Sequence, residues 1–212
     1  MLASAFVAIP LLAGCSESLD SAGNGSSGSA EGKSGKGEVF RSAPIEAEAE
    51  VPRGLRDASS EALIEVLQSS PRYSDYVKLL QLGEVAGDLA TGDSLTVFAP
   101  VNEAVAAQAR LLDSYLKPET LKSALAVMAK GQLPEIDDTE RLGSLLRRGI
   151  TEGELPPNRI RAGLQIQPLE GANLTLAGKG KGFQLEGVEF NAEGGTLAAN
   201  GVLYPSSGLI EP

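Results

Sequence analysis

Residues 96–105, Thr-Val-Phe-Ala-Pro-Val-Asn-Glu-Ala-Val, decide the fold of this chain. Residues 95–98 are rich in β-formers and predict a short buried strand. Pro100 lacks the N–H that a strand ladder needs, so we expect the strand to end there. Asn102 is expected to cap a following helix over 104–116, because its side-chain oxygen can accept from free amides of the first turn. The stretch therefore predicts a buried strand that turns directly into a helix.

Helical periodicity flanks this stretch on both sides. Each segment carries leucines and other apolar residues on one face, as an amphipathic helix does. Serines before the first two segments are the expected caps, Ser59 or Ser60 and then Ser74. The further helices are expected over residues 61–68, from Ser74 onward, from residues 117–119 to Gly131, and over residues 139–148.

The last third of the chain changes character and alternates apolar with polar residues. A glycine-rich stretch, residues 177–182, separates two alternating runs and predicts a β-hairpin. Helices followed by a strand-rich half indicate an α+β arrangement. Strands are expected at 164–166, 174–176, 183–185, 188–190, 196–198, 202–204 and 209–210.

Composition excludes several classes of function. The 212 residues carry a formal net charge of −10, which repels phosphate backbones and argues against nucleic acid as a partner. Histidine is absent, which removes the commonest general base and zinc ligand. Cys15 is the single cysteine, so neither an internal disulfide nor a cysteine-based metal site can form. Any catalysis would have to use carboxylates, lysine or tyrosine; we expect no cofactor and no enzymatic activity.

The N-terminus is typical of an export signal. Residues 2–13 are mostly apolar but too short to span a bilayer as a helix, and no Lys or Arg precedes them. The run ends Leu-Ala-Gly before Cys15, which resembles a bacterial lipoprotein signal in which that cysteine receives a lipid. We therefore predict a signal peptide over 1–14 and, because the next segment is rich in Gly, Ser and acidic residues, a disordered tether over 15–57. The predicted folded domain is 58–212.

Two segments at opposite ends of the domain resemble the signatures of one known family. The first runs from Ala62 to Pro100 and ends in the Thr-Val-Phe-Ala-Pro strand, continued by Asn-Glu-Ala. The second is Asn-Gly-Val-Leu-Tyr over 200–204, followed by an apolar pair and Pro212. Together they resemble the fasciclin-like (beta-Ig-H3/fasciclin) domain over roughly 62–212. The motif residues that carry this resemblance are Thr96, Phe98, Pro100, Asn102, Asn200 and Gly201.

The resemblance implies N-terminal helices packed on a strand-rich, wedge-shaped β-sandwich, and a binding or adhesion role. Two departures stand out: Arg148-Gly149 occupies the place of the family's central Tyr-His pair, and Tyr204 replaces the histidine of the closing strand. In some members the Tyr-His region is implicated in integrin binding and adhesion. That specific role is not carried over to this chain.

Several clusters suggest chemistry, and each has a structural alternative. Gly178–Gly182 lacks phosphate-loop spacing, so a hairpin turn is favoured. Acidic residues 135–140 lack a calcium-loop pattern, so a solvated helix start is favoured. The pair Arg147-Arg148 fits an acidic ligand or a helix C-terminus equally well. Ser206-Ser207 has no general base available to activate a serine nucleophile, so a turn is favoured. The sequons at Asn24 and Asn173 matter only in a eukaryotic secretory route.

Two functional hypotheses follow. The first is a lipid-anchored protein of the bacterial cell envelope, at the outer membrane or cell surface rather than in the cytoplasm. Its domain would bind protein or polysaccharide partners, with membrane attachment through Cys15. The second is an envelope hydrolase or small-ligand-binding protein that uses a carboxylate pair, Glu152 and Glu154. These two acids lie two residues apart in an extended stretch, where side chains point the same way without converging.

Overall fold

The computed structural model describes residues 55–116, 120–134, 136, 138–179 and 182–211. The predicted signal peptide, Cys15 and the tether up to residue 54 lie outside these described residues. Strand β1 spans Arg56–Ala58 and pairs in parallel with β8, so the sheet includes the last two residues of the predicted tether.

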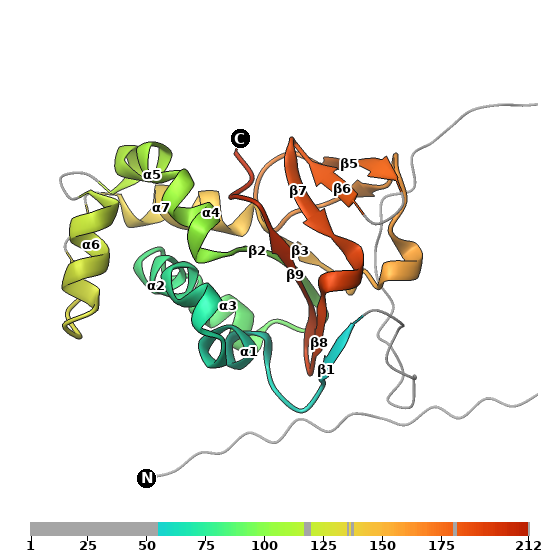
Figure 1. The fold of residues 1–212 in the computed structure, drawn as a ribbon, viewed down its shortest axis with the longest axis horizontal. Coiled ribbons are helices and arrows are strands. Elements are labelled where there is room, and N and C mark those ends of the chain that lie inside the picture. The colour runs from blue at the N-terminus through green and yellow to red at the C-terminus, as the bar shows by residue number, and fades with distance from the viewer. Residues whose placement is uncertain (1–54, 117–119, 135, 137, 180–181, 212) are drawn as a thin grey trace, which may run out of the picture. The chain divides into compact units, whose positions relative to one another are not determined.

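Most of the described helices come first in the chain and most of its strands last, as the sequence predicts. The helices gather on one side of strands β2 and β9, and strands β5 to β7 lie on the other side (Figure 1). The helices are α1 (Leu63–Ser69), α2 (Ser74–Leu82), α3 (Ala86–Thr91), α4 (Asn102–Ala107), α5 (Ala109–Tyr115), α6 (Leu121–Met128) and α7 (Thr139–Arg147). Single 3₁₀ turns lie at Pro71–Tyr73, Pro157–Arg159 and Ala192–Gly194.

The strands form one mixed sheet that combines parallel and antiparallel pairs. Its main path runs β1-β8-β9-β7-β6-β5-β4, while β2 pairs with both β9 and β3. The predicted hairpin is present, because β5 and β6 pair antiparallel. Besides β1, the strands are β2 (Leu95–Pro100), β3 (Ile150–Glu152), β4 (Gln165–Ile166), β5 (Leu174–Lys179), β6 (Gly182–Leu185), β7 (Val188–Asn191), β8 (Thr196–Ala198) and β9 (Gly201–Ser206).

Strands β2 and β9 form a wall between two apolar cores. All six residues of β2 are buried, and alternate side chains point to opposite faces, as a strand requires. Val97 of β2 and Leu203 of β9 belong to the core that the helices cover. Phe98 and Tyr204 belong to the second core, enclosed by β4 to β7. This second core lies within the folded sheet, which agrees with the sandwich expected from the resemblance.

The predicted single helix over 104–116 is wrong, because the chain breaks it into α4 and α5 at Gln108. The Gln108 side chain accepts from the Leu209 N–H at 2.5 Å and donates to the Leu209 carbonyl at 3.2 Å. These bonds also explain why the predicted strand at 209–210 is absent from the structure. The Leu209 backbone pairs with a side chain there, although Leu209 and Ile210 are both buried.

The predicted serine caps are wrong as well. Helix α1 starts at Leu63, and no hydrogen bond from Ser59 or Ser60 caps it; the Glu65 carboxylate accepts from the Ala62 N–H at 2.8 Å instead. Ser74 is the first residue of α2 rather than its cap. At both starts a backbone N–H donates to an oxygen other than the predicted serine hydroxyl, because a free helix N–H can donate to any suitably placed acceptor.

We predict that Gly201→Ala destabilises the domain by about 2 kcal/mol or more. Gly201 has a φ of 151°, and a Cβ there would collide with the backbone carbonyl of Leu95 at the start of the β2–β9 pairing. Urea unfolding of the variant measures the loss. Gly87→Ala is the matched control, since a Cβ there meets nothing within 4 Å in helix α3 and should raise stability by up to about 1 kcal/mol. An unchanged midpoint for Gly201→Ala would contradict the close approach.

Candidate functional site

The first signature strand is held by buried polar bonds as well as by apolar packing. The Thr96 hydroxyl donates to the Gly153 carbonyl at 2.6 Å and accepts from the Leu155 N–H at 2.9 Å. Thr96 is fully buried, so these bonds offset the cost of taking its hydroxyl out of water. They tie β2 to the loop after β3. Thr96 is therefore a structural residue.

Phe98 and Tyr204 meet in the second core. The Phe98 ring lies 4.8 Å from the Phe190 ring and 6.0 Å from the Tyr204 ring, measured between centroids. The Tyr204 hydroxyl donates to the Leu155 carbonyl at 2.7 Å, and burial raises the pKa of this tyrosine. Tyr204 thus stays neutral and serves the core.

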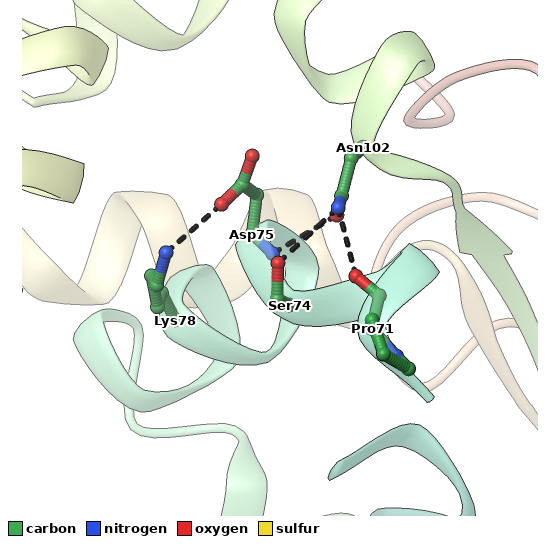
Figure 2. A network of polar contacts seen from close by, with 5 residues as sticks. All are labelled: Pro71, Ser74, Asp75, Lys78 and Asn102. Carbon is green, nitrogen blue, oxygen red and sulfur yellow. Dashed lines mark hydrogen bonds and ion pairs between the residues drawn. The ribbon is translucent and has the colours of Figure 1, made fainter. Parts of the chain in front are cut away.

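Asn102 caps a helix, but a different one from the helix that the sequence predicts. Its Oδ1 accepts from the Asp75 N–H at 3.1 Å, in the first turn of α2 (Figure 2). Its Nδ2 donates to the Pro71 carbonyl at 2.9 Å and to the Ser74 hydroxyl at 3.2 Å. Helix α4, which begins at Asn102, receives no side-chain cap bond from its own N-cap residue, Val101. Asn102 therefore joins the first signature to the start of α2.

Asn200, in the second signature, also bonds the backbone at helix ends. Its Oδ1 accepts from the Leu63 N–H at 2.8 Å, at the first residue of α1. Its Nδ2 donates to the Leu89 carbonyl at 2.8 Å and to the Gly92 carbonyl at 2.9 Å, at the end of α3. One side chain thus satisfies the free amide of one helix and free carbonyls of another. The side chains of Thr96, Asn102 and Asn200 are thus engaged by backbone groups and serve the fold.

The structure separates the two arginines at the end of α7. Arg147 pairs with Asp88 on helix α3, with Nε and Oδ2 2.8 Å apart, and so ties two helices together. Arg148 turns the other way, and its Nε donates to the Glu211 carbonyl at 2.8 Å. Within the described part of the chain, no carboxylate forms an ion pair with Arg148. The two arginines therefore differ: Arg147 has a carboxylate partner, whereas Arg148 bonds a backbone carbonyl and has no carboxylate partner among the described residues.

Arg148 lines a cavity of about 310 Å³ between α5, α7 and the loop before β5. This volume lies at the lower end of the range for small-molecule sites. Of the lining residues, only Arg148 is a candidate from the sequence, because Glu170 and Gly171 reach the cavity from a distant loop. The spacing of Arg141 and Arg148, seven residues apart on one helix face, was the available signal. The lining residues are Tyr115, Arg141, Ser144, Leu145, Arg148, Glu170 and Gly171.

The carboxylate pair of the second hypothesis does not converge. Glu152 is exposed and lines a cavity of about 420 Å³ with Asp88 and Asp93, whereas Glu154 is not among the residues lining it. Burial raises the pKa of Glu154, and its Oε2 is buried without a hydrogen-bond partner. The Glu154 carboxyl, whose pKa burial raises, is thus separate from the cavity that Glu152, Asp88 and Asp93 line.

The remaining candidates have structural roles where they are described. Asp138 caps α7 by accepting from the Arg141 N–H at 2.9 Å, which confirms the predicted helix start, while Glu135 and Asp137 lie outside the described residues. No group of three or more His, Cys, Asp or Glu in the described ranges could hold a metal ion. Ser206 and Ser207 bond the Gly208 carbonyl and the Glu189 N–H. Asn173 is exposed, and Asn24 is not described.

A third cavity, of about 560 Å³, lies beside the β5–β6 hairpin. Phe183, Phe190 and Pro205 contribute apolar surface to it, and the Gln184 side chain donates to the Glu189 carboxylate at 3.0 Å. The two residues at the hairpin tip, 180–181, lie outside the described residues. No arginine or lysine is among the described residues that line this cavity.

We predict that Asn102→Ala lowers the free energy of unfolding by about 1–2 kcal/mol, as loss of a helix cap does. The variant leaves the Asp75 amide and the Pro71 carbonyl without their partner. Chemical denaturation measures the change. Asn173→Ala is the control, because Asn173 is exposed and makes no recorded hydrogen bond; equal losses for the two variants would contradict the bridging role.

We predict that Glu154→Gln stabilises the domain at pH 7 and not below pH 4.5. Below its ordinary pKa of 4.5, the Glu154 carboxyl is protonated in both the folded and the unfolded chain. As pH rises, the unfolded chain loses this proton first, because burial raises the pKa in the folded state, and stability falls. Thermal unfolding against pH checks this, with exposed Glu152→Gln as control. A gap between wild type and Glu154→Gln that does not change with pH would refute it.

Comparison with known proteins agrees with the resemblance read from the motifs. The family model described as "Fasciclin domain" matches residues 71–207, more than half of the chain. No curated protein matches the sequence. Among solved structures, the chain is similar to a FAS1 domain pair from the insect cell adhesion molecule fasciclin I, with 12% identity and a TM-score of 0.48. The match covers 72% of this chain and 51% of that one, so this chain spans about half of its length. On the family match, this chain belongs to the fasciclin-domain family.

Proposed function

We propose that this chain is an exported, lipid-anchored protein of the bacterial cell envelope whose fasciclin domain binds partners at the cell surface. The family supports a general adhesion or binding role, since fasciclin domains occur in adhesion modules of extracellular and cell-surface proteins. The anchor would be a lipid on Cys15, followed by a Gly/Ser-rich tether. The partners would be proteins or polysaccharides.

One observation carries the binding role over an enzymatic one. The polar side chains of both signatures, Thr96, Asn102 and Asn200, are occupied by backbone groups. Catalysis needs polar groups that converge on a substrate and whose donors and acceptors are not already occupied by the protein. Fasciclin domains are generally non-enzymatic, and these residues follow that pattern. The chain's surface and cavities, rather than its signatures, are therefore where a partner would be held.

The alternative, an envelope hydrolase or small-ligand-binding protein built on carboxylates, has less support. A catalytic pair needs two carboxyl groups in one concave site with pKa values driven apart. Glu152 is exposed and lines a cavity, whereas Glu154 is half-buried and is not among the residues that line it. The acidic cavity beside Glu152 also contains Asp88, which is already paired with Arg147.

The location of the protein rests on the N-terminal signal. No helix among the described residues is long and apolar enough to cross a membrane. A single acyl chain binds membranes only weakly, whereas two or three chains on one cysteine anchor a protein stably. The tether would then let the domain reach past the membrane surface.

We predict that the mature protein begins at Cys15 with a diacyl or triacyl glyceryl group. Mass spectrometry of the N-terminus, after expression in a bacterial host, measures this directly. Cys15→Ser should leave the signal uncleaved at this site and remove the lipid mass, while Ser16→Ala should keep both cleavage and lipid. A mature N-terminus elsewhere, without lipid, would exclude the anchor.

The binding role has its own test. Cells that carry the full chain should attach to surfaces and retain envelope material on pull-down, and cells that carry a chain without residues 58–212 should lose both. The truncated chain keeps the signal and the tether, so any difference reports on the domain. Equal attachment and equal retention by the two chains would remove the adhesion and binding claim.

A further inference from the structure

The cavity between α5, α7 and the loop at residues 170–171 gathers positive charge on an acidic protein. Arg141 and Arg148 line it together with one acid, Glu170. The chain as a whole carries −10, so a cavity with two guanidinium groups differs from the average surface. Tyr115 and Leu145 supply the apolar part of the lining and are both buried.

Arg148 is positioned by the fold rather than left to move freely. Its Nε donates to the Glu211 carbonyl at 2.8 Å, which fixes the plane of the guanidinium. On the other side it passes close over Gly171, where a Cβ would lie 2.5 Å from Nη1. Gly171 also has a φ of 98°, which glycine adopts readily and other residues rarely do. Both the loop conformation and the position of Arg148 therefore require glycine at position 171. The two Nη groups have no recorded partner among the described residues.

Arg141 reaches the same cavity from the start of α7. Its guanidinium carbon lies 4.5 Å from the centre of the Tyr115 ring, a cation–π distance that orders the long side chain. No carboxylate in the described ranges forms an ion pair with it. Two guanidinium groups thus face one cavity with their N–H donors available, and such groups bind carboxylates strongly.

Glu170 limits which carboxylate-bearing ligand fits. Its Oε1 accepts from the Ser144 hydroxyl at 2.6 Å, which leaves Oε2 as an acceptor at the cavity. A ligand that offers only negative charge would be repelled by this carboxylate. A ligand that carries hydroxyl groups beside its carboxylate can donate to Glu170 while the arginines hold its acid.

We propose that this cavity binds a hydroxylated carboxylate of the sugar-acid type, as a free molecule or as one unit of an acidic polysaccharide. The arginines would hold the carboxylate, Glu170 would accept from ring hydroxyls, and Leu145 and Tyr115 would contact the apolar edge of the ring. The cavity volume of about 310 Å³ suits one such unit. This inference rests on the proposed binding role and is independent of the lipid anchor.

The test is calorimetric titration of the full mature chain at pH 7 with four probes. D-galacturonate carries both the acid and the hydroxyl groups, D-galactose only hydroxyl groups, and propionate only the acid. A glutamate pentapeptide represents an acidic protein partner. We expect galacturonate to bind at least about tenfold more tightly than the other three, because only it engages both kinds of group. Equal binding of galactose, propionate or the peptide would overturn the assignment.

Variants place the binding at this cavity. Arg148→Gln and Arg141→Gln should each weaken galacturonate binding about tenfold, the loss expected for one charge-assisted contact. Arg147→Gln is the matched control, since Arg147 is the adjacent residue but pairs with Asp88 and is not among the residues that line the cavity. Equal weakening by Arg147→Gln, or no weakening by Arg148→Gln, would show that the sugar acid binds elsewhere.

A trimer of galacturonate distinguishes the two sources of the ligand. Tighter binding of the trimer than of the monomer indicates a polysaccharide, and weaker binding indicates a free sugar acid, which the overall negative charge of the protein would favour. If galacturonate fails to bind while the domain still captures envelope material, the cavity assignment falls and the binding role stands. If Arg148-dependent galacturonate binding is found but neither attachment nor capture depends on residues 58–212, the adhesion role falls and the cavity assignment stands.

Discussion

Strands β2 and β9 run parallel over six residues each, from Leu95 beside Gly201 to Pro100 beside Ser206. The two strands are about a hundred residues apart in the chain, so their pairing closes a long loop at an entropic cost. Thr96, Phe98 and Pro100 of the first signature lie in β2, and Gly201 of the second begins β9. The two apolar cores pack against opposite faces of this strand pair. A residue larger than glycine at position 201 would collide with the Leu95 backbone and push the strands apart, so the pairing of β2 with β9 requires glycine there.

The two signature asparagines connect this strand pair to the helices. Asn102 satisfies the start of α2, and Asn200 satisfies the start of α1 and the end of α3. Helix ends carry free amides and carbonyls that cost free energy when buried, so each asparagine stabilises several elements at once. Both asparagine side chains are engaged in hydrogen bonds that serve the fold.

Arg147 and Arg148 show how adjacent residues of one type take different roles. On a helix, neighbouring residues point about 100° apart, so Arg147 meets Asp88 while Arg148 faces the loop at Gly171. In the sequence, Arg147 and Arg148 form one feature for which ligand binding and helix capping are equal alternatives. The structure assigns a structural partner to the first and a cavity to the second.

Much of the fold was determined by the sequence itself, because the spacing of apolar residues and the backbone preferences of proline and glycine set local structure. Alternation predicted the β5–β6 hairpin, and Pro100 marked the end of β2. The break at Gln108, the partner of Asn102 and the cavity beside Arg148 were decided only by tertiary structure. Each depends on a group distant in the chain, such as Leu209, Asp75 or Glu170, and local pattern carries no information about which distant backbone group will lie within hydrogen-bond reach.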